Sequence, residues 1–484
     1  MPLYVGLDVG TQGTKAVVYD LESRRVISRA SAQYPLLTDE RRPGMAEQSP
    51  DEHWIAGVKQ AVSRALSKDG LVKDEVCAIG VSGQQHGLVV LDENKEVVRP
   101  SKLWCDTESS AEAEELSEKF GWSFGPSFTG SKVLWLKRNE PEHWERTRHI
   151  LMPKDYVNLW LTGQIATEAS DASGTAYFDP LKRDWDARAM DVIGIPREYL
   201  PPLLDPHQSV GRVRSEIASL FGIPSGTLVS PGGGDNAMSA LACSAVKDGT
   251  CVMSLGTSGT LFSSSSRAVL DETGTICPFC DCTGAYLPLI CTLNCAEVPE
   301  DVRAQWGDIS VEEITAMAAA EPAGCGGVTY LPYLRGERTP NWPQSYGALL
   351  GLRKGALRPG LVYRAALEGV TFALLAGVAA MRSLGVSRLE EVILVGGGAK
   401  NPLWQRIIAD AFRVGVTLIE EEETAALGGA LQAAAVHSGE RDVASFVSSN
   451  APAKGRTIRP NPKESEAYEA AFQRHQSLGK VIFG

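Results

Sequence analysis

Residues 4–20 read YVGLDVGTQGTKAVVYD, and residues 251–265 read CVMSLGTSGTLFSSS. Each stretch runs from β-forming apolar residues into a Gly-Thr-x-Gly-Thr turn and then into a second apolar run. This pattern predicts a β-hairpin with glycines at the tight positions. Because the pattern occurs once in each half of the chain, it predicts two lobes of related fold.

A second pair of similar stretches follows in the same order. Residues 76–87 (VCAIGVSGQQHG) and residues 392–401 (VILVGGGAKN) are apolar, as buried strands are, and each runs into a glycine turn. We therefore expect an α/β fold with two domains, residues 1–246 and 247–484, that flank a central cleft. Apolar spacing and capping residues predict helices near residues 50–66, 237–246, 361–381 and 425–436.

The composition is that of a two-domain globular protein. The chain has 484 residues, and single cores stop growing at about 250–300 residues. Its net charge of −12 argues against a partner that is a nucleic acid or an anionic membrane. The N-terminus has no targeting signal, and the apolar stretch at residues 370–381 is short for a bilayer, so we expect a cytoplasmic protein. A small molecule is the expected partner, and a homodimer is left open.

The two glycine turns, at residues 10–14 and 256–260, suggest phosphate binding. A turn of Gly and Thr directs several N–H groups and hydroxyls to one point, which suits a phosphate group. If the two turns line opposite walls of the cleft, they would hold the polyphosphate of a nucleotide, and Lys15 would add a charge-assisted contact. Either turn alone could be no more than a turn. The Walker pattern G-x-x-x-x-G-K-[ST] does not occur in the sequence, which disfavours a P-loop fold.

Two acids lie at the ends of predicted strands. Asp235 follows three glycines in PGGGDN (231–236), where its carboxylate could take the proton of a hydroxyl that attacks a γ-phosphorus. Asn236 would bind a neighbouring hydroxyl. The alternative is that Asp235 only caps the following helix. Asp8 lies between apolar residues directly before the first turn, so we expect it to hold Mg²⁺ at the polyphosphate.

Three further motifs have both a functional and a structural interpretation. The glycines of VGGGAKN (395–401) could admit an adenine ring or a ribose, or form a plain turn. His86 follows two glutamines and has no nearby nucleophile or acid in the sequence, which favours polyol recognition over a catalytic triad. In YLRGERTP (333–340), Glu337 and Arg338 either pair across the cleft or are solvated.

Five cysteines cluster between residues 277 and 295 in CPFCDC and CTLNC. Their spacing could support a zinc site. Apolar residues interleave with them in a strand-like run, however, and free cysteines are often buried, so buried thiols are the favoured interpretation.

Together these motifs resemble the FGGY family of carbohydrate kinases over nearly the whole chain. The stretches that carry the resemblance are GLDVGTQGTK (6–15), SFTGSKVLWLKRNEPE (127–142), LMPKDYVNLWLTG (151–163), TEASDASGTAYFD (167–179), PGGGDN (231–236), SLGTSGT (254–260), YLPYLRGERTP (330–340) and VGGGAKN (395–401). The resemblance implies two ribonuclease-H-like domains of the actin, Hsp70 and hexokinase type that close over ATP and a sugar.

The resemblance also implies roles for individual residues. Asp235 would be the general base, and Gln85, His86, Asp235 and Asn236 would contact an open-chain ketose. The ATP and Mg²⁺ contacts would come from Asp8, Thr11, Gln12, Lys15, Gly256, Thr257, Gly397, Gly398 and Asn401, with Trp306 as an aromatic on the nucleotide side. Asp8 would be the metal ligand.

The sequence departs from the family in two places. Gln85 stands where similar family members usually have Met, and an amide there could bind an extra hydroxyl and change the preferred polyol. The segment at residues 291–306 resembles the family poorly.

The expected activity is transfer of the γ-phosphoryl group of ATP to the terminal hydroxyl of a ketopentose, with D-xylulose as the favoured acceptor. One alternative is a kinase for ribulose, ribitol or glycerol. Another is an actin-like or Hsp70-like ATPase without sugar kinase activity. A third is a sugar sensor without catalysis, against which the presence of both Asp8 and Asp235 argues.

Overall fold

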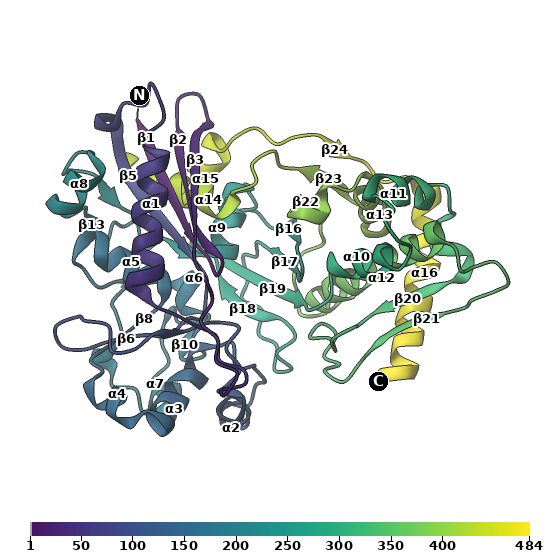
Figure 1. Cartoon of the computed structure of the whole chain (residues 1–484), viewed down its shortest axis with the longest axis horizontal. Helices are drawn as coiled ribbons and strands as arrows, with labels where there is room; N and C mark the ends of the chain where they lie inside the picture. The colour runs from purple at the N-terminus through teal and green to yellow at the C-terminus, as the bar shows by residue number, and fades with distance from the viewer. Residues whose placement is uncertain (1) are drawn as a thin grey trace.

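The computed structural model describes residues 2–484 and consists of two α/β lobes, each built on a seven-stranded sheet (Figure 1). In spatial order, the first sheet contains β13 (Gly211–Arg212), β14 (Leu228–Val229), β5 (Val76–Gly83), β1 (Leu3–Val9), β2 (Gly13–Asp20) and β3 (Arg25–Gln33), and β15 (Gly233–Gly234) also pairs with β5. The second sheet contains β18 (Cys277–Cys280), β19 (Tyr286–Thr292), β17 (Gly259–Ser263), β16 (Thr250–Leu255), β22 (Glu391–Val395), β23 (Gly415–Leu418) and β24 (Thr457–Ile458).

The two sheets share one arrangement at their centres. In the first lobe β1 pairs with β2 as an antiparallel hairpin and with β5 in parallel. In the second lobe β16 pairs with β17 as an antiparallel hairpin and with β22 in parallel. The structure therefore confirms the two lobes that the repeated hairpins predicted. The expected boundary after residue 246 falls between α9 and β16 and stays a prediction.

Helices surround the two sheets. The first half of the chain contains α1 (Ala56–Ala65), α2 (Ser110–Phe120), α3 (Thr129–Asn139), α4 (Pro141–Arg146), α5 (Pro153–Thr162), α6 (Ala169–Ala172), α7 (Ala187–Ile193), α8 (Ser215–Phe221) and α9 (Asp235–Ala242). The second half contains α10 (Glu297–Ala304), α11 (Val311–Ala319), α12 (Pro359–Ser383), α13 (Pro402–Phe412), α14 (Thr424–Ser438), α15 (Val443–Asn450) and α16 (Pro462–Phe483).

The predicted helices are present, with some differences at their ends. Ser49 accepts a hydrogen bond from Glu52 N as a cap, but the first turn, Pro50–Ile55, is a π-helix that leads into α1. The helix predicted to reach residue 246 ends at Ala242.

Helix α12 is long and apolar enough to span a bilayer by length and composition. However, 89% of its most apolar 18-residue window is buried inside the chain, as in a core helix.

Helix α14 belongs to the second half of the chain but packs on the sheet of the first lobe. It contacts α9, β5 and β1, and Figure 1 shows it beside these strands. The contact is close because glycines line it. A Cβ atom on Gly80 would lie 2.0 Å from the carbonyl oxygen of Gly429, and one on Gly6 would overlap the carbonyl of Ala426. The Ala- and Gly-rich sequence of α14 therefore allows a helix to lie directly on two strands.

Candidate active site

The first glycine turn joins β1 to β2 and is fixed through its carbonyl oxygens. The Tyr34 hydroxyl donates to the Gly10 carbonyl at 2.8 Å, and Gln48 Nε2 donates to the Thr11 carbonyl at 2.7 Å. Gly10 N donates to the Gly13 carbonyl at 3.1 Å and closes the turn. Because these carbonyls are occupied, the N–H groups of residues 11 and 12 are groups that the turn can offer to a ligand.

Two side chains that sequence reasoning did not assign to this turn bind the Thr11 hydroxyl. The Thr11 hydroxyl donates to Gln84 Oε1 at 2.9 Å and accepts from Trp104 Nε1 at 2.9 Å. Trp104 is 45% exposed, so its ring lies at the surface beside the turn. Gln84 could have been assigned from its place at the end of the strand beside β1, whereas Trp104 carries no such signal. Gln12 is exposed in the turn.

Asp8 and Lys15 lie opposite each other on β1 and β2, next to the turn. The Asp8 carboxylate accepts from the Ser82 hydroxyl at 3.3 Å, and burial raises the pKa of Asp8 to about 6. Lys15 Nζ lies 2.7 Å from a carboxylate oxygen of Glu423, which precedes α14. A half-buried carboxylate with one hydrogen-bond donor fits Mg²⁺, because this ion is bound by one or two carboxylates and otherwise by water and phosphate.

Asp235 is the first residue of α9, and Gly234 occupies the N-cap position. Its Oδ1 accepts from Asn236 N at 2.7 Å and from Asn236 Nδ2 at 2.9 Å. Burial, and after it the nearby Asp8 carboxylate, raises the pKa of Asp235 to about 7. The structure therefore brings the acid of the glycine loop close to the acid of the phosphate turn. A carboxyl that titrates near neutral pH can accept a proton from a substrate hydroxyl.

Three buried side chains from distant parts of the sequence hold the backbone of residues 231–234. Asn158 Nδ2 of α5 donates to the Pro231 carbonyl at 3.0 Å, and Ser170 Oγ of α6 accepts from Gly234 N at 3.1 Å. Gln432 of α14 accepts from Gly232 N at 2.9 Å and donates to Gly232 O at 3.0 Å. Sequence reasoning missed all three, since nothing local to them marks the contact.

His86 lies in the left-handed region at φ 68° and faces the junction of the lobes. Its Nδ1 is 2.7 Å from the Gly174 carbonyl, and its ring packs on Phe128 of the first lobe and Phe279 of β18 in the second, at centroid distances of 4.9 and 5.6 Å. Burial lowers the pKa of His86 to about 3, so the ring is neutral. Because Nδ1 must donate to the carbonyl, Nε2 is an acceptor for a ligand hydroxyl.

Gln85 lies beside the Asp235 loop. Its Nε2 donates to the Ser170 carbonyl at 3.2 Å, and its Oε1 is 3.5 Å from Asn236 Nδ2. Gln85 is buried, and its amide already has these two contacts. The structure thus places Gln85, Asn236 and Asp235 together.

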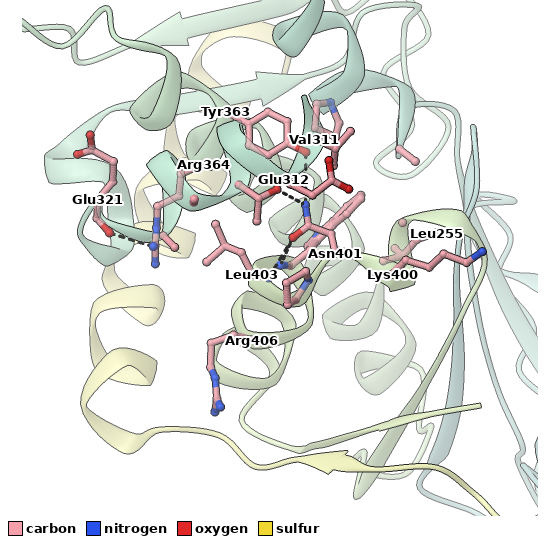
Figure 2. Close-up of a pocket in the computed structure, with 18 of the residues that line it drawn as sticks. Leu255, Val311, Glu312, Glu321, Tyr363, Arg364, Lys400, Asn401, Leu403 and Arg406 are labelled. Atoms are coloured by element: carbon pink, nitrogen blue, oxygen red, sulfur yellow. Dashed lines mark hydrogen bonds between the residues drawn. The ribbon is translucent and has the colours of Figure 1, made fainter. Parts of the chain in front are cut away.

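A cavity of about 1120 Å³ lies in the second lobe (Figure 2). The predicted nucleotide residues among those that line it are Gly256, Thr257, Gly397, Gly398 and Asn401. Its other walls come from α10, α11, α12, α13 and the start of α16. Figure 2 shows Lys400 and Leu255 at one end and Arg364 with Glu321 at the other. Cavities of 300–1,000 Å³ are typical of small-molecule sites, so this one is large enough for a nucleotide.

The side chain of Asn401 is used within the protein. It caps α13 by accepting from Leu403 N at 3.0 Å and Trp404 N at 3.1 Å, and it donates to the Thr315 hydroxyl at 3.1 Å. Asn401 therefore shapes the cavity wall. Trp306, 38% exposed, is not among the described residues that line this cavity.

The five clustered cysteines lie on and around β18 and β19. Burial raises the pKa of the Cys291 thiol to about 11 and that of Cys280 to about 12. Burial therefore favours the protonated thiols at neutral pH, and within residues 2–484 no three of these cysteines have the spacing of metal ligands.

Within residues 2–484, the one group with metal-ligand spacing is Glu47, Asp106 and Glu108, far in sequence from the cysteines. The buried ammonium of Lys102 lies among these acids, 3.0 Å from Asp106 and 3.4 Å from Glu47. Arg42 pairs with Glu108 and Arg99 with Glu47, so three cations already balance the three acids.

Models of the FGGY family of carbohydrate kinases match both halves of the chain. The N-terminal domain of the family matches residues 3–242, and the C-terminal domain matches residues 251–437.

Named relatives cover almost the whole chain. Xylulose kinase of Haemophilus influenzae is 37% identical, and the alignment covers 98% of both chains. Xylulose kinase of Streptomyces rubiginosus is 37% identical and covers 91% of this chain and 89% of its own.

Solved structures show the same two-lobed fold. A xyloylose kinase from Brucella ovis has a TM-score of 0.93 at 32% identity and covers 99% of both chains. Xylulose kinase from Bifidobacterium adolescentis has a TM-score of 0.83 at 30% identity, with 97% and 99% covered. Glycerol kinase from Plasmodium falciparum with ADP has a TM-score of 0.85 at 20% identity, a likeness of fold alone.

Proposed function

The chain belongs to the FGGY family of carbohydrate kinases and is an ATP-dependent sugar kinase, and we propose that its acceptor is D-xylulose. The γ-phosphoryl group of ATP would pass to the terminal hydroxyl of this ketopentose and give D-xylulose 5-phosphate. The acceptor is inferred from the 37% identity with xylulose kinase of Haemophilus influenzae. The observation that supports the chemistry is that Ser82 of β5 pairs with Asp8 of β1 and with Gly233 of β15, so that the acid of the phosphate turn and Asp235, two residues after Gly233, lie at one edge of the sheet.

Asp235 acts as the general base in this proposal. Its carboxylate takes the proton of the terminal hydroxyl as the hydroxyl oxygen attacks the γ-phosphorus. Asn236 holds Asp235 in place through two hydrogen bonds. The neutral His86 accepts from a hydroxyl of the sugar through Nε2, and Gln85 closes the subsite beside Asp235.

The nucleotide occupies the cavity of the second lobe, and its phosphates point toward the first lobe. Gly397 and Gly398 admit the nucleotide close to the backbone, and Gly256 and Thr257, which follow the paired strand β16 at the same end of the cavity, contact its phosphates. Thr11, Gln12 and Lys15 complete the phosphate site from the first lobe. We do not assign Trp306 a contact, because it lies outside the cavity lining.

Asp8 is the residue that would hold Mg²⁺. When bound, this ion neutralises the polyphosphate. The Asp8 carboxylate would hold the ion beside Lys15.

The central test is Asp235→Asn, which keeps the size of the side chain and removes its basicity. We expect ketose phosphorylation to fall by about 10²- to 10⁴-fold. A non-hydrolysable ATP analogue should still raise the melting temperature, since the nucleotide cavity is in the other lobe. Asp205→Asn, at an exposed position, is the control. Full activity of Asp235→Asn would remove Asp235 from the role of base.

The acceptor itself is tested by a coupled ADP assay with D-xylulose, ribulose, ribitol and glycerol. D-xylulose should give the highest kcat/KM, and a different best substrate would overturn the assignment. ADP release that no polyol stimulates would instead indicate an ATPase without sugar kinase activity. We further propose a cytoplasmic enzyme, where ATP is available, and a homodimer, which light scattering after size-exclusion chromatography would test.

A further inference from the structure

The loop at residues 333–346 joins β20 (Thr329–Pro332) to β21 (Gly347–Leu350), and the buried Glu337 fixes it. The Glu337 carboxylate accepts from Leu293 N at 2.7 Å, from Asn294 Nδ2 at 3.0 Å and from Arg338 N at 2.8 Å. Glu337 is therefore neither solvated nor paired across the cleft, contrary to both sequence-based interpretations. The loop has a set conformation from which the next side chain projects.

That next side chain, Arg338, extends over β18 and β19. Its Nη2 lies 3.7 Å from the Sγ atom of Cys277, and its guanidinium is close enough to Cys291 to lower the pKa of that thiol against the larger effect of burial. Within residues 2–484, no carboxylate lies in ion-pair distance of Arg338. A partly buried guanidinium that has only a thiol as its side-chain partner retains most of its five N–H donors for another ligand.

The same surface of β18 leads from Arg338 to His86. Cys277 and Phe279 are two residues apart on this strand, so their side chains project from one face. The Phe279 ring packs on His86 at 5.6 Å. Arg338 also contributes to the lowered pKa of His86, after burial, so the two groups are in electrostatic reach. Arg338 of the second lobe and His86 of the first therefore contact the same face of β18, Arg338 at Cys277 and His86 at Phe279.

We propose that Arg338 is the residue of the second lobe that recognises the acceptor, its guanidinium donating to the carbonyl oxygen of an open-chain ketose that His86 binds by a hydroxyl. This inference rests on the proposed function. The chemistry of the two groups is complementary, because Arg338 can only donate whereas Nε2 of the neutral His86 can accept. A ketose offers an acceptor-only carbonyl beside its hydroxyls. A pentitol has a hydroxyl in place of that carbonyl. Its oxygen can also accept from Arg338, but its hydrogen needs an acceptor that a guanidinium does not provide, so Arg338 would favour ketoses.

The experiment compares Arg338→Met and Arg338→Lys with the wild type. Arg335→Met is the matched control, because Arg335 lies in the same loop but pairs with Glu297 and is 63% exposed. We measure KM and kcat for D-xylulose, xylitol and ATP, and the melting temperature with and without an ATP analogue. Arg338→Met should raise KM for D-xylulose about 10- to 100-fold, since a hydrogen bond from a charged donor is lost. In this variant, KM for ATP and the lower kcat/KM for xylitol should stay unchanged. Arg338→Lys should recover part of the loss for D-xylulose.

Two results would overturn the inference. One is a wild-type KM for D-xylulose and wild-type selectivity over xylitol in Arg338→Met. The other is an equal rise of KM for D-xylulose, xylitol and ATP, which would indicate a structural role. If Arg338→Met does not fold, the same comparison with Arg338→Lys decides. Failure of the proposed function is distinguishable, because the wild type would then not phosphorylate D-xylulose.

Discussion

Asp235 titrates near neutral pH because of where it lies. Burial, followed by the Asp8 carboxylate, raises its pKa to about 7. A general base works when deprotonated, so kcat/KM for the sugar should fall about tenfold per unit as the pH drops below 7 and be level above it. A pH–rate profile between pH 5 and 9 checks this, and an activity that is level down to pH 5 would contradict it.

Asn236 provides the variant that ties this pH dependence to Asp235. Its side-chain amide donates to Asp235 Oδ1 at 2.9 Å and so lowers the pKa of that carboxyl. In Asn236→Ala the charged form loses this bond, and the acid limb of the profile should move to higher pH. If Asn236→Ala only weakened binding of the sugar, KM would rise and the acid limb would stay at the same pH. The position of the limb therefore distinguishes lost sugar binding from a changed pKa of Asp235.

Sequence reasoning proposed Asp235, Asn236 and His86 as site residues because each follows a glycine turn or a buried strand, where side chains reach a cleft edge. It could not identify Ser170 or Gln432. Their roles consist of hydrogen bonds to backbone groups 64 and 200 residues away, and no local pattern encodes such a contact.

Helix α14 joins these distant parts of the chain. It lies on β1 and β5, and its buried Gln432 binds both the N–H and the carbonyl of Gly232, three residues before Asp235. The helix was predicted, but its packing was not. Ala and Gly residues lie on all sides of the helix itself. Its sequence therefore has no single apolar face that would show which sheet it covers.

Replacing Gln432 should therefore impair the base without touching either substrate. Gln432→Leu leaves both polar groups of Gly232 buried without this partner and loosens the loop. Since a small displacement of a reacting group can cost up to about 10²-fold, we expect kcat to fall about 10- to 100-fold with KM for ATP unchanged. Steady-state kinetics and circular dichroism are the measurements.

The matched control is His437→Leu in the same helix. His437 Nδ1 lies 3.0 Å from the Tyr4 hydroxyl, away from the Asp235 loop. If both variants lose kcat equally, the effect comes from a destabilised helix, and Gln432 has no role in positioning Asp235.

In the molecule as a whole, the two lobes were predictable because a hairpin and a buried strand recur in the same order. The recurrence could not show that the two lobes hold different parts of the proposed site. The first lobe holds Asp235, His86 and Asp8, whereas the cavity suited to a nucleotide lies wholly within the second. The sheets share one topology, but the helices that cover them differ, and these helices form the walls of the cavity.

This division predicts that nucleotide binding can be removed without altering the sugar side, and Gly397 is the position for it. Gly397 lines the cavity, and a Cβ atom there would meet no atom within 4 Å. Gly397→Leu should therefore fold normally while its side chain takes up space that the nucleotide needs. We expect KM for ATP to rise at least about tenfold, because the leucine side chain would displace the nucleotide from at least one well-placed contact. KM for the sugar should stay near the wild-type value.

Thermal shift separates this outcome from a general defect. A ligand stabilises the folded state according to its affinity, so the rise in melting temperature with an ATP analogue should shrink in Gly397→Leu and persist in Asp235→Asn. Gly398→Leu is the contrasting variant, because its Cβ atom would lie 2.7 Å from the Trp404 ring and 2.9 Å from Leu255, so it should lower the melting temperature even without ligand. If Gly397→Leu binds the analogue as the wild type does, the nucleotide does not contact this glycine. The proposal that the nucleotide binds in the second-lobe cavity would then be wrong.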